Sequence, residues 1–84
     1  MKKVEWKKNF PDHFHAAIQE MQFEPGATGF AVYKGVTVHL KITEKENDLT
    51  CHAMVVSFDP ATPALPDLKL GEVVEVGIQH FVPM

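Results

Sequence analysis

The stretch FAVYKGVTVHLKI, residues 30–42, decides the fold that this sequence predicts. Polar and apolar side chains alternate along it with a period of two, which is typical of β-strands with one face in the core. A glycine at position 35 indicates a hairpin whose loop covers residues 33–35. In the second half of this hairpin the even-numbered residues 36–42 are apolar, so we expect them to face the core.

The next stretch, residues 41–58, predicts a second hairpin that turns at residues 46–48. This turn would align Phe58 with Val36, so that even-numbered residues of both strands share the core side. A last strand is predicted over residues 72–82. The residues expected to face inward in these two later strands are Met54, Val56, Phe58, Val74, Val76 and Ile78.

Residues 10–23 have helical spacing instead, because their apolar side chains recur every three or four positions. Asn9 can cap the start of this helix, and Pro25-Gly26 ends the pattern. We therefore predict an α+β fold, in which one amphipathic helix packs on one face of a four- or five-stranded, mainly antiparallel sheet.

Length, charge and cysteine content restrict the class of protein. A chain of 84 residues predicts a single domain, residues 1–84. Eleven acidic residues against eight lysines, with no arginine, argue against nucleic acid as the main partner. One cysteine suits a reducing compartment, and the sequence shows neither a signal peptide nor an apolar run of about 20 residues. We therefore expect a soluble cytoplasmic protein without a membrane partner.

The sheet face turned away from the helix is less polar than a solvated face should be. The residues on it that we expect to contact a protein partner, or a second copy of the chain, are Tyr33, His39, Ala53, Val55 and Phe81. The alternative is that the N-terminal segment, with Trp6, folds back over this face.

A proline-rich connection, residues 59–71, precedes the last strand. Pro60, Pro63 and Pro66 recur every third residue, which aligns them along one edge of a polyproline II helix. Such a segment suits an aromatic groove on a partner, so we expect these prolines to bind a partner as well. Alternatively, they stiffen a long crossing connection.

No catalytic residue, metal site or cofactor is predicted, because no motif has the required spacing. The sequence therefore favours a small non-enzymatic binding protein, such as a bacterial or phage accessory factor, an inhibitor or an assembly subunit. A second hypothesis is a metal- or thiol-dependent enzyme or sensor that uses His52, His80 and Cys51. A third is the binding of single-stranded nucleic acid through Trp6, Tyr33 and the lysine-rich N-terminus.

Overall fold

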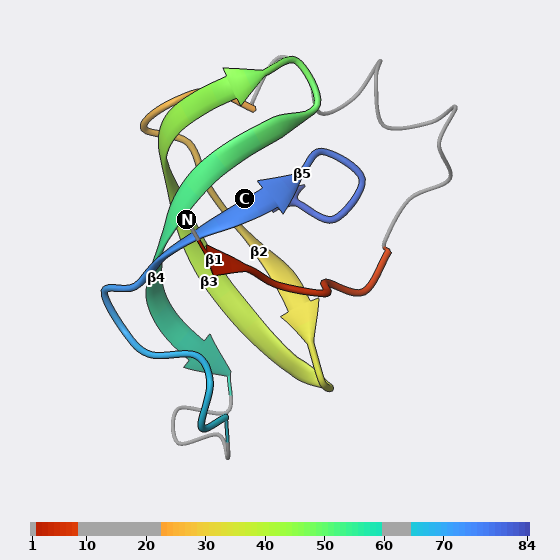
Figure 1. Ribbon diagram of the computed structural model, residues 1–84, viewed down its shortest axis with the longest axis vertical. Coiled ribbons are helices and arrows are strands. Elements are labelled where there is room, and N and C mark those ends of the chain that lie inside the picture. Colours follow the sequence, from red (N-terminus) through yellow and green to blue (C-terminus); the bar gives the residue numbers. More distant parts are fainter. Residues whose placement is uncertain (1, 9–22, 60–64) are drawn as a thin grey trace.

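The computed structural model of the chain describes residues 2–8, 23–59 and 65–84 (Figure 1). The strands in these residues are β1 (Lys2–Lys3), β2 (Thr28–Tyr33), β3 (Val36–Asn47), β4 (Thr50–Asp59), β5 (Val73–Gly77) and β6 (Val82–Pro83). They form one six-stranded sheet in the order β1-β5-β4-β3-β2-β6. β1 and β5 run parallel, and the other neighbouring strands are antiparallel.

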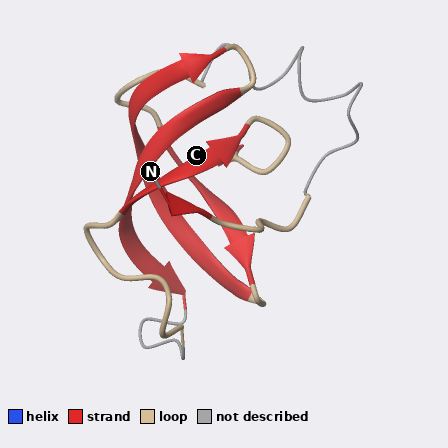
Figure 2. Cartoon of the chain, in the orientation of Figure 1, coloured by secondary structure: helices blue, strands red, loops and turns tan. Residues whose placement is uncertain are grey.

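The predicted α+β fold is wrong, because the described part of the chain is all β and contains no helix (Figure 2). Most of the predicted helix, residues 10–23, lies outside the described residues. Its last residue, Phe23, is described, and it is buried without being helical. Within the described ranges, no helix has the length and apolar character needed to cross a membrane.

The sheet covers its own core because it curls. β3 and β4 are 12 and 10 residues long and bend around the interior (Figure 1). Side chains on the inner face therefore pack against one another and against the connecting segments. The buried residues of this core are Trp6, Phe23, Ala31, Val38, Leu40, Ile42, Cys51, Ala53, Val55, Leu68, Val74, Val76, Ile78 and Phe81.

The two ends of the chain lie along the edges of the curled sheet. At the N-terminal end, Lys2 pairs with Val74 of β5, and the amide of Lys7 then donates a hydrogen bond of 2.8 Å to the carbonyl of Val32 on β2. At the C-terminal end, β6 pairs with β2 beside this contact. The N-terminal segment therefore links strands from opposite sides of the sheet, and backbone groups that an open edge would expose are hydrogen-bonded.

The alternation predicted for β3 and for the last strand is confirmed. The residues whose inward orientation is confirmed by full burial are Val38, Leu40, Ile42, Val74, Val76 and Ile78. The last predicted strand, residues 72–82, is however divided, because a turn at residues 77–80 separates β5 from β6.

The first hairpin has a two-residue turn, Lys34-Gly35, instead of the predicted loop over residues 33–35. Tyr33 and Val36 form the pair that closes it. Both turn residues have positive φ, 51° and 80°, which is typical of a type I′ turn. This turn matches the right-handed twist of the two strands, and that twist helps the sheet to curl.

The second hairpin also turns through two residues, Asp48 and Leu49, closed by the pair Asn47–Thr50. The prediction placed a three-residue turn at residues 46–48. The observed turn is one residue shorter and lies further along the chain, so the predicted pairing of β3 with β4 is wrong: Phe58 pairs with Val38 instead of Val36.

The pairing of β3 with β4 is also interrupted, most importantly in the middle of the sheet. Val55 pairs with Leu40 and Ser57 pairs with His39, so Val56 has no partner on β3. This extra residue is a β-bulge. It reverses the alternation of β4, so that the residues after the bulge face the opposite way from the parity of those before it.

The bulge reverses the predicted orientation of β4. Before the bulge the inward row is Cys51, Ala53 and Val55, all of them buried. The predicted inward orientation of Met54 and Val56 is therefore wrong, and Val56 is 44% exposed. Beyond the bulge, Phe58 packs against the core as predicted.

Substituting Gly29 with alanine should lower the free energy of unfolding by about 1–3 kcal/mol, the usual cost of overpacking. A Cβ at position 29 would lie 2.2 Å from the carbonyl oxygen of Val82 and 2.6 Å from the Phe81 ring, so β6 would have to move. Gly77→Ala is the matched control, because its nearest neighbour is the movable side chain of Gln79 at 2.9 Å. Equal losses for the two variants in urea denaturation would contradict the close packing of β6 on β2.

Candidate functional site

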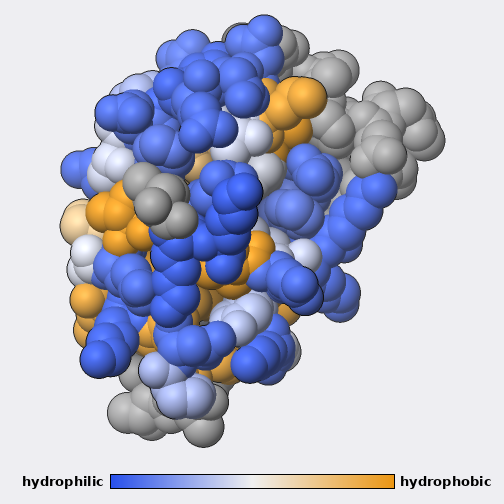
Figure 3. Space-filling model, viewed as in Figure 1, coloured by the Kyte–Doolittle hydropathy of each residue, from blue (hydrophilic) through white to orange (hydrophobic). Residues whose placement is uncertain are grey.

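Three apolar residues on the outer face of β4 and β5, and one from the connection that runs beside β4, form what we call the outer patch: Met54, Val56, Val73 and Leu70. Val56, Leu70 and Val73 are 44%, 63% and 37% exposed, and Met54 is half-buried. Met54 and Val73 are direct cross-strand partners. The space-filling view shows hydrophobic surface along the left edge of the molecule (Figure 3).

The connection that precedes β5 brings Leu70 to this patch. The amide of Gly71 donates a hydrogen bond of 2.8 Å to the carbonyl of Val55, and the amide of Val55 donates one of 2.9 Å to the carbonyl of Glu72. Leu70 is therefore held next to β4 at the level of the bulge. Two backbone features, the bulge and this tight connection, bring the apolar side chains of the patch together on the surface.

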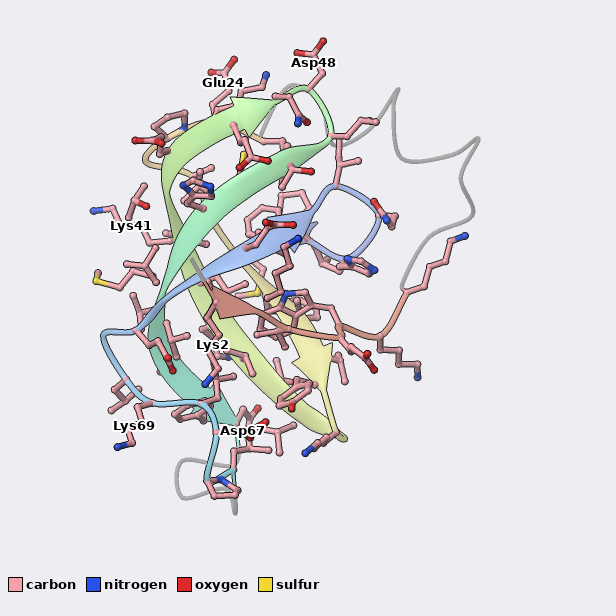
Figure 4. All side chains as sticks on the ribbon, in the orientation of Figure 1. Lys2, Glu24, Lys41, Asp48, Asp67 and Lys69 are labelled. Atoms are coloured by element: carbon pink, nitrogen blue, oxygen red, sulfur yellow. The ribbon has the colours of Figure 1, made fainter. Side chains whose placement is uncertain are left out.

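Two lysines border the outer patch. Lys41 on β3 is the cross-strand partner of Met54, and Lys69 directly precedes Leu70 in the chain. Both are exposed, and neither forms an ion pair with any residue that the structure describes. Their side chains extend from the same side of the molecule (Figure 4).

The same outer face becomes acidic toward the β3–β4 turn. His52 lies there between its cross-strand neighbours Glu44 and Glu75. Its Nδ1 is 3.5 Å from Oε1 of Glu44, and its Nε2 is 3.1 Å from Oε1 of Glu46. Both ring nitrogens of His52 therefore already contact carboxylates of the same hairpin.

Of the five residues predicted to form a contact row on the outer face, only His39 lies there. Ala53, Val55 and Phe81 are at most 1% exposed and belong to the core, so the outward orientation predicted for them is wrong. Tyr33 is half-buried and packs against the core. In the folded chain, a partner can reach His39 and part of Tyr33, but not the other three.

The proline-rich connection is only partly described. Pro66 is exposed, whereas Pro60 and Pro63 lie outside the described residues. Next to Pro66, the Oδ2 atom of Asp67 accepts a hydrogen bond from the hydroxyl of Tyr33. This hydrogen bond is the main reason that the pKa of Asp67 is lowered, and it anchors the end of the connection to the sheet.

The three residues of the metal or thiol hypothesis lie in three different environments. Cys51 is in the core, where burial raises the pKa of its thiol to about 11, whereas His52 is on the outer face. His80 lies in the turn between β5 and β6, where burial and, to a smaller extent, Lys8 lower its pKa. Across the described ranges, no group of three or more His, Cys, Asp or Glu side chains is arranged to hold a metal ion.

Two cavities, of about 310 and 370 Å³, lie along the N-terminal segment and share Lys3 in their walls. The first is also lined by Trp6 and His80, and the second by Tyr33. Trp6 is only 7% exposed, and its indole N–H donates a hydrogen bond of 2.9 Å to the carbonyl of Glu75. It is therefore a core residue and offers no open ring face on which a nucleic-acid base could stack.

Sequence reasoning missed the outer patch, although one signal for it is present. Residues 53–56 are four consecutive apolar residues, so both faces of this part of the strand carry apolar side chains. Searches against protein-family models, curated proteins and solved structures found no match. The function therefore has to be inferred from the chemistry of the residues themselves.

Proposed function

We propose that this chain is a small non-enzymatic binding protein, and that it contacts a protein partner through the outer patch. The observation that carries the proposal is the exposure of Val56, Leu70 and Val73, which are 44%, 63% and 37% accessible and lie on neighbouring backbone segments. A chain this short needs most of its apolar side chains for its core. Apolar residues that are instead gathered on the surface are typical of a contact site.

The form of the patch supports the proposal. Met54 and Val73 come from paired strands, so a rigid backbone holds them, and the hydrogen bonds of Val55 fix the approach of the connection. A preformed surface loses little conformational entropy when it binds. An accessory factor, an inhibitor and an assembly subunit would each act through a surface of this kind.

We expect Val56→Lys to remove the partner that the wild-type chain captures from its native host. A lysine at position 56 projects into solvent, so the fold is retained while a charge is placed in the centre of the apolar contact. The measurement is affinity capture followed by mass spectrometry, with Thr37→Lys on the same face of β3 as the matched control.

The control should capture the same proteins as the wild type. If Val56→Lys captures them too, in unchanged amount, the outer patch is ordinary surface and the proposed function is refuted. Circular dichroism of the variant would first establish that it is folded.

A further inference from the structure

We infer that the partner of the outer patch is a protein surface with an apolar groove bordered by carboxylates. This inference rests on the proposed function and adds to it the chemistry of the partner. It follows from the charge at the border of the patch and from the shape of the sheet beneath it. It also follows from the contacts that the acidic groups on the same face already make.

The charge at the border of the patch is positive. Lys41 lies beside Met54 and Lys69 beside Leu70, and neither has an ionic partner among the residues that the structure describes. The chain as a whole has a net charge of −3, so two free lysines beside its exposed apolar residues contrast with the rest of the molecule. Carboxylates on a partner would complement them, which favours correct association and disfavours wrong partners.

The sheet curls around its core, and the patch lies on the outer, convex side of the sheet (Figure 1). Two convex faces bury little area against each other, whereas a convex face fits a groove. In a symmetric contact, like surfaces also meet, so that Lys41 and Lys69 of both copies would be brought near one another. The carboxylate of Glu72, next to Val73, already contacts the ammonium group of Lys2 and the amide of Lys69. The carboxylates of Glu44 and Glu46, further along the outer face, already contact His52.

The inference can be tested with two synthetic peptides of twelve residues. One alternates leucine with glutamate, and the other alternates leucine with lysine. In amide NMR titrations of the full chain, the acidic peptide should shift the resonances of Met54, Val56 and Val73. The lysine peptide should leave these resonances in place.

Variants then assign the attraction to the two lysines. Lys41→Glu/Lys69→Glu should weaken binding of the acidic peptide by about tenfold or more, because two favourable charge pairs become repulsive. Lys3→Glu/Lys7→Glu changes the net charge equally but lies on the N-terminal segment, and it should leave the affinity within about twofold.

Three outcomes would overturn the inference. The first is equal binding of the two peptides, and the second is equal weakening by the two double variants. The third is light scattering that shows a wild-type dimer and a monomeric Val56→Lys variant, since the occupant would then be a second copy of the chain. The proposed function is judged separately, because it fails only if Val56→Lys keeps the captured partner.

Discussion

Replacing Trp6 with alanine is expected to lower the free energy of unfolding by about 3–5 kcal/mol, the range measured for large aromatic residues in cores. Trp6 is 7% exposed, its ring centroid is 5.9 Å from that of Tyr33, and its indole donates a hydrogen bond to the carbonyl of Glu75. A small domain has a total stability of roughly 5–15 kcal/mol, so this loss is a large part of the whole.

The effect should exceed that of a cavity alone, because Trp6 lies between two backbone contacts of the N-terminal segment. Lys2 pairs with β5 on one side, and the amide of Lys7 bonds to Val32 on the other. Trp6→Phe is the matched control: it keeps a ring and loses the indole hydrogen bond, at an expected cost of about 1–2 kcal/mol.

Urea denaturation followed by circular dichroism measures both variants, since Trp6 is the single tryptophan and fluorescence is lost with it. A loss below about 1 kcal/mol for Trp6→Ala would show that the N-terminal segment does not contribute to the closure of the sheet.

Val55→Lys and Val56→Lys should differ strongly in their free energy of unfolding, although the two positions are neighbours in the chain. Val55 is 1% exposed and Val56 is 44% exposed. A lysine at position 55 would place an unpaired charge in the core, which costs about 3–5 kcal/mol. At position 56 the same side chain reaches water, so the change should stay within about 0.5 kcal/mol.

This pair of variants tests the bulge directly. Strict alternation with even-numbered residues inward would reverse the result, making Val56→Lys the damaging substitution. Thermal unfolding monitored by circular dichroism distinguishes the two registers. A stable, folded Val55→Lys variant would contradict the pairing of Val55 with Leu40.

The positions of the main strands could be predicted from the sequence, because alternation and glycine turns are local signals. Residues 30–42 form a hairpin, and Val38, Leu40 and Ile42 face inward as their parity indicates. The orientation of β4 could not be predicted by parity, because one unpaired residue, Val56, reverses it. The lengths of the two turns could not be predicted either, because two- and three-residue turns share the same residue types.

The fold class was mispredicted because the helical spacing of residues 10–23 led us to expect a helix over the apolar face of the sheet. In the described residues, the curled sheet and four side chains from outside its central strands do this instead: Trp6, Phe23, Leu68 and Phe81. In the sequence, these four lie outside the two central hairpins, in three different segments. Only long-range contacts reveal that they share one core, and no local pattern encodes such contacts.

The candidate site, like the fold, could be predicted only in part from the sequence. That an apolar surface exists on the outer face was an expectation from composition and alternation, but three of its predicted members, Ala53, Val55 and Phe81, are in the core. The sequence by itself determined which segments form the main strands and near which residues the two hairpins turn, since strand and turn preferences depend on neighbouring residues. Only the tertiary structure decided which side of β4 meets water, because a single bulge and the approach of Leu70 depend on hydrogen bonds between distant segments.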